Sequence, residues 1–386
     1  MKRIYICLLA GWMFCAQTAF AAEPRVTAQG AALLDAETGR LLWGKNEEEP
    51  LEMASTTKIM TAILVLEKGN PNDVVTVSKH AARQPDVQMG LKEGEQWYEQ
   101  DLLTAMMLKS YNDAAVALAE QISGSVEVFC QEMTEKAKAI GAKDTVFGSP
   151  NGLDSHLTKD QHHSTAYDMG LIAGYALQNP TFRQIVATPS ETFTDVSGKI
   201  SHTAVNTDRF LQMYSGALGV KTGYTNKAGN CFVGAATQDE VTLVSVVLGC
   251  GWGEAGKQAK WTDTKALMDY GFDTYEKQTV AKAGTILDRA AVSRSPVSEV
   301  DVGLASDYQA VLSEEEAEQI QITAKIPTVL EAPLQKGTVV GQAEIRLGDS
   351  VLGDVELLTM ADAPTYTLMQ QYHRLLEVWC DWAVFL

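Results

Sequence analysis

The pattern of apolar residues changes near Tyr275, and this change limits what the chain of 386 residues can fold into. Before it, apolar residues recur at helical spacing in several segments that lie between strand-like runs. After it, short alternating runs are separated by prolines and glycines, and no long helical pattern is visible before Thr367. We therefore predict a mixed domain of sheet and helices over residues 22–276, followed by a small all-β domain over residues 277–362.

The first domain begins and ends with strand patterns. Strands are predicted as a β-hairpin over residues 25–45 and as three later strands over 217–221, 231–236 and 241–248. Helical spacing predicts helices over residues 53–68, 99–140, 166–177 and 262–270. This order predicts an α/β fold in which one sheet is covered by helices and carries a helical insert. In the second domain, we interpret the acidic run Glu314–Glu318 as a solvated loop.

The first 21 residues have the order of a secretory signal peptide. Lys2 and Arg3 precede an apolar run from Ile4 to Cys15, and Ala19-Phe20-Ala21 offers the small residues that a signal peptidase reads. The apolar run is shorter than the ~20 residues that span a bilayer, which argues against a transmembrane anchor. We predict export, cleavage after Ala21 and an extracytoplasmic mature protein.

Net charge and cysteine content exclude two other classes of protein. The formal net charge is −18, so phosphate backbones would repel the chain and we expect no nucleic acid partner. Six cysteines are too few for a disulfide scaffold in a chain of this length. Signal cleavage would leave Cys130, Cys231, Cys250 and Cys380. Cys231 and Cys250 lie on predicted neighbouring strands and could face each other, but buried thiols are the interpretation that we favour.

A single position in the chain has a serine followed three residues later by a lysine, in Ser55-Thr56-Thr57-Lys58. The pair lies at the start of a predicted helix, where this spacing places both side chains on one face. A serine is a weak nucleophile until a base removes its proton. A lysine amine can be that base when burial or a second cation lowers its pKa. Alone, the pattern is a weak signal, and a helix cap followed by a solvated lysine explains it more simply.

Two later segments favour the catalytic interpretation. Ser110-Tyr111-Asn112 interrupts a helical pattern, and Lys221-Thr222-Gly223 ends a predicted strand. The motifs S-x-x-K, S-x-N and K-T-G in this order are typical of serine enzymes that react with β-lactams. Ser149-Pro150-Asn151 also fits S-x-N, but Pro150 and Gly152 indicate a turn, so we assign the motif to Ser110.

The sequence around these motifs resembles the low-molecular-mass penicillin-binding proteins, the serine-type D-alanyl-D-alanine carboxypeptidases of the peptidase S11 kind. The resemblance covers nearly the whole mature chain. It lies in Ala54–Ala62, Asn151–Leu153, Ser164–Met169, Gly219–Ala235 and Ala332–Leu358. It implies a penicillin-binding, serine β-lactamase-like transpeptidase domain, with an antiparallel sheet, packed helices and a helical subdomain, followed by a small all-β domain.

The resemblance also implies a reaction. Ser55 would attack the carbonyl of the penultimate D-Ala of a peptidoglycan stem peptide and release the terminal D-Ala from an acyl-enzyme, which water then hydrolyses. Penicillins would acylate the same serine. Lys58 would be the base, Ser110 would pass a proton to the leaving amine, and Asn112 would bind Lys58 and the substrate amide. Neither a metal nor another cofactor is implied.

Substrate binding is implied for the strand motif. Lys221 and Thr222 would bind the terminal carboxylate, and Lys221 would be the second cation that lowers the pKa of Lys58. Backbone N–H groups of Ser55 and Tyr224 would form the oxyanion hole. Gly223, lacking a side chain, would let the strand edge lie close to the substrate.

One expected feature is missing, and other chemistries lack their motifs. The family often has a further basic residue near the carboxylate, but Gly249–Lys257 contains no arginine, so Lys257 and Lys260 are candidate replacements. G-x-S-x-G and H-E-x-x-H are absent from the chain. The cluster His156, His162 and His163 is at most a weak metal-site candidate.

The C-terminal segment over residues 363–386 predicts an amphipathic helix. Its apolar face consists of Leu368, Tyr372, Leu375, Trp379, Trp382 and Leu386. A terminal helix docked on the β-domain is one interpretation. The family resemblance implies a membrane anchor, and we expect attachment to the outer face of the cytoplasmic membrane, driven by apolar burial because the polar face is not basic.

Two other functions fit parts of the sequence. A serine β-lactamase would need rapid deacylation, but Tyr111 stands where class A enzymes have aspartate, and a β-domain is appended. A non-catalytic protein that binds peptidoglycan or β-lactams is the second alternative. All the catalytic residue types are present, so the sequence gives it little support.

Overall fold

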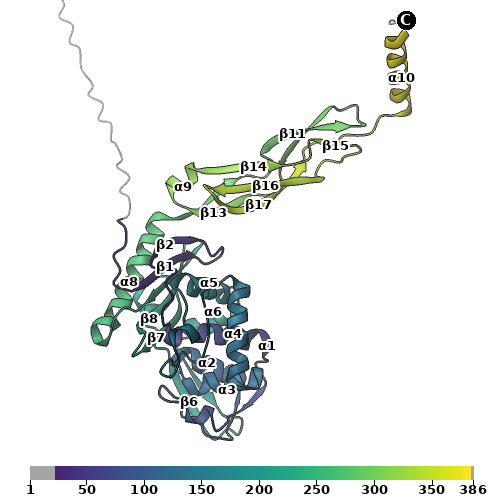
Figure 1. The fold of residues 1–386 in the computed structure, drawn as a ribbon. Helices are drawn as coiled ribbons and strands as arrows, with labels where there is room; N and C mark the ends of the chain where they lie inside the picture. Colours follow the sequence, from purple (N-terminus) through teal and green to yellow (C-terminus); the bar gives the residue numbers. More distant parts are fainter. Residues whose placement is uncertain (1–21, 384–386) are drawn as a thin grey trace, which may run out of the picture.

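The computed structural model describes residues 22–383 (Figure 1). The predicted signal peptide over residues 1–21 lies outside the described residues. An antiparallel sheet of five strands forms the centre of the first domain, in the order β2-β1-β9-β8-β7. Its strands are β1 (Gly30–Asp35), β2 (Leu41–Lys45), β7 (Ala217–Thr225), β8 (Gly229–Gln238) and β9 (Val241–Leu248). The predicted hairpin and the three later strands are confirmed.

Helices cover both faces of this sheet. Successive residues of β1 point to opposite faces, so Leu34 packs in the core beneath the helical subdomain and Leu33 packs in a second core with Leu267. Leu267 belongs to α8 (Gly253–Thr274), a longer helix than the one predicted over residues 262–270. Buried apolar side chains on both faces explain why every residue of β1 is buried.

The helical insert contains most of the remaining elements of the first domain. The helices are α1 (Lys58–Lys68), α2 (Glu99–Lys109), α3 (Asn112–Ser123), α4 (Val126–Ile140), α5 (Ala166–Leu177), α6 (Pro180–Ala187) and α7 (Phe210–Met213). Two small hairpins pair β3 (Val74–Thr76) with β4 (Gln96–Tyr98) and β5 (Ser190–Thr194) with β6 (Ser201–Val205). The helical pattern over residues 99–140 forms three helices because Ser110 and Gly124 adopt the left-handed conformation, with φ of 65° and 77°. The sequence pattern did not predict α6, α7 or the β5–β6 hairpin.

The second domain is a β-structure with its own core. Six strands are ordered β14-β16-β17-β12-β11-β15, and β10 pairs with β13. The strands are β10 (Glu276–Ala281), β11 (Ile286–Ser293), β12 (Glu299–Leu304), β13 (Tyr308–Leu312), β14 (Ile320–Lys325), β15 (Val329–Glu331), β16 (Val339–Leu347) and β17 (Ser350–Thr359). The predicted all-β fold of this domain is confirmed. Its core is separate from those of the first domain and is built from residues such as Val302, Ile345 and Leu357.

The acidic run after β13 is a helix, and the interpretation of it as a solvated loop was wrong. Glu314–Glu318 forms the short helix α9. Ser313 and Glu316 make a capping box, in which the Ser313 side chain accepts from the Glu316 backbone and the Glu316 carboxylate accepts from the Ser313 backbone. An acidic first turn also suits the positive end of the helix dipole.

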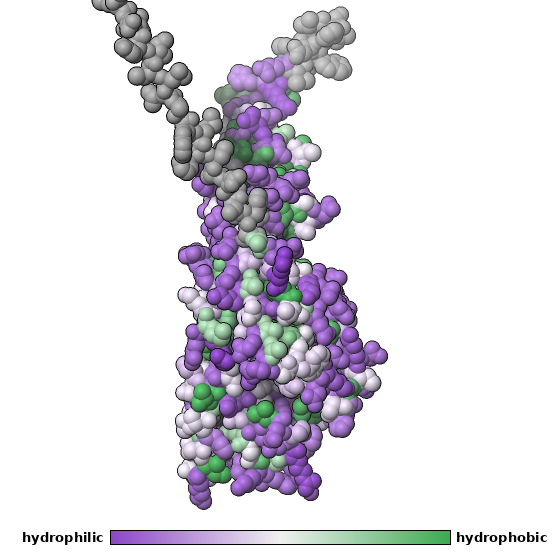
Figure 2. All heavy atoms as spheres, turned by 90° about the vertical axis from the view of Figure 1, so that its left-hand side faces the viewer, coloured by the Kyte–Doolittle hydropathy of each residue, from purple (hydrophilic) through white to green (hydrophobic). Residues whose placement is uncertain are grey.

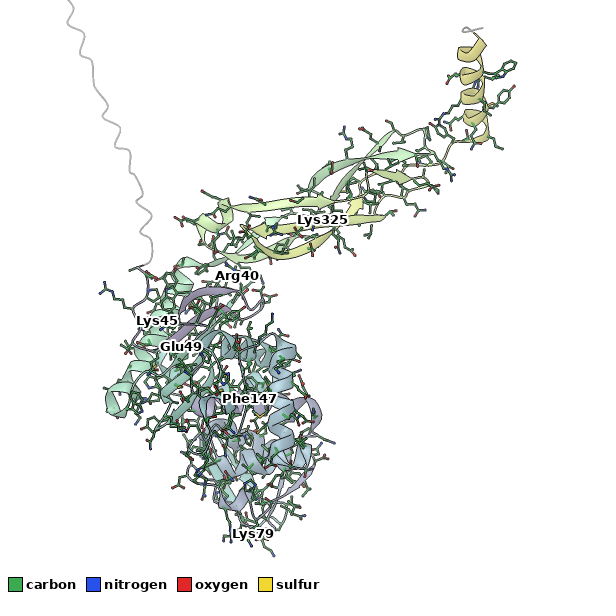
Figure 3. All side chains as sticks on the ribbon, in the orientation of Figure 1. Arg40, Lys45, Glu49, Lys79, Phe147 and Lys325 are labelled. Carbon is green, nitrogen blue, oxygen red and sulfur yellow. The ribbon has the colours of Figure 1, made fainter. Side chains whose placement is uncertain are left out.

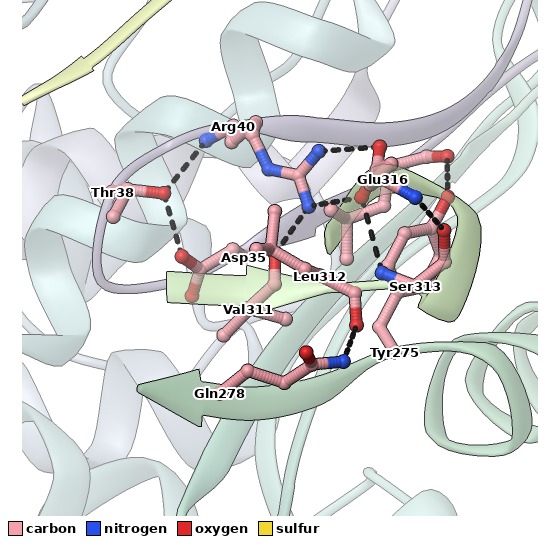
Figure 4. A network of polar contacts seen from close by, with 10 residues as sticks. Asp35, Thr38, Arg40, Tyr275, Gln278, Val311, Leu312, Ser313 and Glu316 are labelled. Atoms are coloured by element: carbon pink, nitrogen blue, oxygen red, sulfur yellow. Dashed lines mark hydrogen bonds and ion pairs between the residues drawn. The ribbon is translucent and has the colours of Figure 1, made fainter. Parts of the chain in front are cut away.

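The same helix connects the two domains through Arg40, which lies at their junction (Figures 3 and 4). The two terminal guanidinium nitrogens of Arg40 donate to the Glu316 carboxylate, Nη1 over 2.8 Å and Nη2 over 3.1 Å. Nη2 also donates to the carbonyl of Val311. The guanidinium carbon lies 5.7 Å from the ring centre of Tyr275. A bidentate ion pair and an aromatic contact therefore link Arg40, the residue before β2, to α9 of the second domain and to Tyr275 at the end of α8.

A final helix, α10 (Leu368–Ala383), follows the β-domain at its far end from the first domain (Figure 1). Several of its apolar side chains are exposed, including Leu368, Tyr372, Leu375 and Trp379. On the face shown in Figure 2, hydrophobic side chains are otherwise scattered among hydrophilic ones. Within residues 22–383, no helix combines the length and the apolar character that a membrane crossing needs.

Candidate active site

Ser55 lies on a short 3-10 turn, η1 (Ala54–Thr57), that leads directly into α1. Ala54 adopts φ of 49°, a conformation unusual for a residue with a side chain. The hydroxyls of Thr56 and Thr57 each donate back over 2.7 Å, to the carbonyls of Met53 and Ala54. These bonds hold the strained turn, and Ser55 is its one residue that is not fully buried.

Lys58 lies one turn further on and is completely buried. Its Nζ lies 3.1 Å from Ser55 Oγ, 2.8 Å from Asn112 Oδ1 and 2.6 Å from the carbonyl oxygen of Asn151. Burial, and then the charge of Lys221, hold the pKa of Lys58 well below its usual range. A neutral amine has two N–H groups and one lone pair. In the structure Lys58 Nζ donates to all three oxygens, and Ser55 Oγ donates to the Asn151 carbonyl over 3.3 Å. Loss of one proton from Nζ would leave N–H groups for Asn112 and Asn151 and a lone pair facing Ser55 Oγ.

The segment Ser110–Asn112 places Asn112 against Lys58 and carries a second polar side chain, Ser110. Ser110 ends α2, and its buried Oγ has no hydrogen-bond partner within the described residues. Asn112 begins α3 and is oriented by its Nδ2, which donates to the carbonyl of Pro85 over 3.0 Å. This bond fixes the amide so that Oδ1 faces Lys58. The left-handed backbone of Ser110 thus produces the break between helices at which both side chains lie.

The strand β7, at the edge of the sheet, carries Lys221 and Thr222. Lys221 is buried, and its Nζ donates to the carbonyl of Thr222 over 3.2 Å. Burial lowers the pKa of Lys221 to about 7, an effect that the carboxylate of Asp208 opposes and the charge of Lys260 increases. Near neutral pH, the buried Lys221 is therefore divided between its charged and its neutral form.

Gly223 lies against the turn that carries Ser55. A Cβ at this residue would lie 3.1 Å from Met53 O and from Ser55 N, so its missing side chain lets β7 pack closely against this turn. The next residue, Tyr224, has an exposed side chain, and its hydroxyl donates to Asn226. The backbone at Gly223 and the backbone of Ser55 are thus in direct contact.

The two candidate replacements for the missing arginine occupy different surroundings. Lys257 is exposed and pairs with Glu254 at 3.7 Å. Lys260 is buried, and its charge acts on both Lys221 and Asp208. Burial raises the pKa of Asp208 to about 7, and one of its carboxylate oxygens has no partner within the described chain. Lys260, not Lys257, belongs to the charged cluster behind β7.

Asn151 contacts the serine and the lysine, although we did not select its S-x-N segment from the sequence. The contact is made by the backbone carbonyl, which accepts from Lys58 and from Ser55 Oγ at 3.3 Å. Gly152 has φ of 82°, and a Cβ there would overlap the backbone of Ala54. Asn-Gly in a turn was a visible signal for the loop, but a backbone acceptor leaves no side-chain pattern to recognise.

The histidines and cysteines have structural contacts. His162 is buried; it accepts from the Gly148 backbone over 3.1 Å and lies 3.3 Å from the Thr57 hydroxyl, and burial lowers its pKa to about 4. Among residues 22–383, no three His, Cys, Asp or Glu side chains are grouped as metal ligands. Cys130, Cys231 and Cys250 are buried thiols, as expected.

The fold and the site define a class of protein. A serine on a strained turn, a buried lysine three residues later, and an edge strand ending in Lys-Thr-Gly are the shared parts of serine enzymes that react with β-lactams. The family model for D-alanyl-D-alanine carboxypeptidase matches residues 17–251, and that for the C-terminal domain of penicillin-binding protein 5 matches residues 275–365. The chain belongs to the serine-type D-alanyl-D-alanine carboxypeptidase family.

Individual relatives agree over most of the chain. The D-alanyl-D-alanine carboxypeptidase DacF of Bacillus subtilis is 31% identical over 94% of this chain and 95% of its own length. DacC of Escherichia coli is 32% identical over 89% of this chain and 88% of its own length. The solved structure of penicillin-binding protein 5 from Haemophilus influenzae is 28% identical, with a TM-score of 0.70, over 89% of this chain and 99% of that one. The predicted fold class is confirmed, and the carboxypeptidase function is supported over the β-lactamase alternative.

Proposed function

We propose that this carboxypeptidase removes the terminal D-Ala of peptidoglycan stem peptides through an acyl-enzyme on Ser55, with Lys58 as the base. The observation that carries the proposal is the set of contacts around Lys58 Nζ. Asn112 Oδ1 and the Asn151 carbonyl accept its two N–H groups, and Ser55 Oγ lies 3.1 Å away. A buried, neutral amine held in this way can accept the proton of the serine.

In the first step, Ser55 Oγ bonds to the carbonyl carbon of the penultimate D-Ala while Lys58 takes its proton. The negative charge that develops on the carbonyl oxygen is stabilised by the backbone N–H groups of Ser55 and Tyr224. Gly223 packs against Ser55 N, which supports a position of the Tyr224 N–H beside the same turn. The C–N bond then breaks, and the proton held by Lys58 passes through Ser110 to the leaving amine, which leaves Lys58 neutral again.

Deacylation requires a water molecule in place of the departed D-Ala. Lys58 again takes a proton, now from the water as it attacks the acyl carbon, and returns it to Ser55 Oγ as the bond between Ser55 Oγ and that carbon breaks. Penicillin carries an amide carbonyl and a carboxylate in a similar arrangement, so the same attack opens its ring and leaves Ser55 acylated.

The substrate carboxylate binds to Lys221 and Thr222. Every substrate of this reaction ends in a free carboxylate, and Lys221 is a buried cation on the strand next to Ser55. Lys260 adds positive charge from α8, in place of the arginine that the family often has. A cation in a water-poor site binds an anion more strongly than a surface cation does.

Export and membrane attachment form the second part of the proposal. Residues 1–21 supply the signal for export, so the mature enzyme would meet its substrate outside the cytoplasm. The helix α10 supports attachment to the outer face of the cytoplasmic membrane, because Leu368 is 86% exposed and Trp379 is 76% exposed on it. The β-domain lies between α10 and the first domain and would separate the active site from the lipid surface (Figure 1).

The test of the catalytic proposal is the variant Ser55→Ala. It should release no D-Ala from a pentapeptide substrate and bind no fluorescent penicillin, because both reactions need the same attacking oxygen. Ser149→Ala is the matched control, since Ser149 lies in the unassigned S-x-N segment. Full penicillin labelling of Ser55→Ala would show that another serine is the nucleophile.

A further inference from the structure

A pocket lies in the first domain, away from Ser55. It has a volume of about 280 Å³ and lies between α1, α2, α6 and the start of β5. Its apolar walls include Leu103 and Ile185, and its polar groups include Gln184 and Thr188. The pocket lies beside the N-terminus of α2, whereas Ser110 follows the C-terminus of this helix of 11 residues. The helix therefore separates Glu99, which lines the pocket, from Ser110 by roughly 16 Å along its axis.

A buried carboxyl group lines this pocket. Glu99 is 2% exposed, and its Oε2 has no hydrogen-bond partner within the described residues. The backbone leaves room for this side chain, since a Cβ at Gly69, the residue that ends α1, would overlap the Glu99 carboxyl group. A buried polar atom without a partner is costly, so it marks a place where a ligand with a donor group would be stabilised.

The charge around Glu99 selects the kind of ligand. Burial, and then the charge of Asp73, raise the pKa of Glu99 to about 7, and Glu191 also lines the pocket. None of the described lining residues is basic. A cation would relieve both the missing hydrogen bond and the repulsion between these acids.

The remaining lining favours an organic cation over a metal ion. A metal ion would need several oxygen or nitrogen ligands, and the described residues contain no group of three acidic, histidine or cysteine side chains arranged for one. Leu103 and Ile185 instead offer apolar surface beside the single buried carboxyl. This combination suits a charged nitrogen on a short carbon stem.

We propose that this pocket binds a primary ammonium group on an alkyl stem, with the nitrogen paired to Glu99 and the stem against Leu103 and Ile185. The site is separate from the catalytic one and takes a ligand of opposite charge to the substrate carboxylate. The bound amine would contact α2 and α6. Helix α2 leads to Ser110, and α6 packs against β7.

The test is calorimetric titration of the full chain with n-butylammonium, compared with n-butanol as the neutral molecule of similar size. We expect n-butylammonium to bind at one site and n-butanol to bind at least about tenfold more weakly, because a charge-assisted hydrogen bond is lost. Glu99→Gln keeps the size of the side chain and should weaken n-butylammonium binding by a similar factor. Glu93→Gln, an exposed control in the preceding loop, should leave it unchanged.

Two results would overturn the proposal. Equal affinity of wild type and folded Glu99→Gln for n-butylammonium would place the amine elsewhere, for example among the acids near the active site. Equal binding of n-butylammonium and n-butanol would mean that the pocket recognises only apolar volume. A melting temperature of Glu99→Gln near that of wild type shows that the comparison is between folded proteins.

Discussion

The two domains differ in whether they bury charged side chains. The first domain buries Lys58, Lys221, Lys260 and Asp208. In the described β-domain over residues 277–362, the buried polar residues are Ser295 and Thr359, and none of the buried residues is charged. Its ion pairs, such as Arg289 with Asp301, lie at the surface. Burying a charge is expensive, so the first domain holds these groups at a cost to its stability.

The difference indicates where the chemistry lies and what the second domain contributes. Low solvent access lowers the pKa values of Lys58 and Lys221, that of Lys221 to about 7. The β-domain has a separate apolar core and no such group, which is typical of a spacer or support. Substitutions of the buried charged residues of the first domain should therefore affect turnover, whereas substitutions of charged residues in the second domain should have little effect on it.

The largest effect is expected for Lys58→Ala. Removal of a catalytic base slows reaction by about 10²- to 10⁴-fold, so acylation by fluorescent penicillin should slow by this factor, with partial recovery at high pH where hydroxide replaces the base. Lys325→Ala is the control, because Lys325 is an exposed partner of Glu344 in the β-domain. Stopped-flow labelling measures both variants. Wild-type acylation by Lys58→Ala at neutral pH would remove Lys58 from the mechanism.

The next effect concerns the substrate carboxylate and Lys221. Converting the terminal carboxylate to an amide removes charge-assisted hydrogen bonds of roughly 1.5–3 kcal/mol each, so kcat/KM of the wild type should fall at least about tenfold. The same change of substrate should matter much less in Lys221→Ala, because the partner is already absent. Equal turnover of acid and amide by the wild type would contradict carboxylate recognition and, with it, the exopeptidase activity.

A pH profile separates the two lysines without a mutation. Lys221 is charged below its pKa of about 7, so raising the pH through 7 removes the cation that binds the carboxylate. The kcat/KM for the acid substrate, which reports the free enzyme, should fall on this alkaline side, by no more than the loss in Lys221→Ala. The amide substrate should lack this limb and follow only the deprotonation of Lys58. Identical profiles for the two substrates would assign the limb to another group.

Most of the first domain and most of the site residues could be predicted from the sequence, because periodic apolar residues and side-chain motifs leave direct signals. The strand predicted over residues 241–248 has the bounds of β9. The β5–β6 hairpin was not predicted, since Phe193 is the single buried residue of β5 and gives no alternation to recognise. The same limit applies to the site: the carbonyl of Asn151 has no side-chain signature. The approach of Lys260 to Lys221 depends on the packing of α8 against the sheet.

The smallest effect is expected at Arg40, where the two domains meet. Its contacts with Glu316 and Val311 lie far from the serine, so Arg40→Ala should leave D-Ala release within about twofold of wild type. The side chain is 19% exposed and the ion pair is bidentate, so the loss of stability should be about 1 kcal/mol, near the upper end for partly exposed pairs.

The same substitution should act on the arrangement of the domains, because the guanidinium of Arg40, just before β2, contacts both α9 and Tyr275. We expect a broader distribution of inter-domain distances by small-angle X-ray scattering and faster proteolysis near residue 275. Arg294→Ala is the matched control, since Arg294 and its partner Glu331 both belong to the β-domain. If Arg40→Ala changes the distance distribution no more than Arg294→Ala does, the junction is held by other contacts. If instead Arg40→Ala lowers turnover strongly, then charges at the β-domain do affect the chemistry, and the contrast between the two domains is wrong.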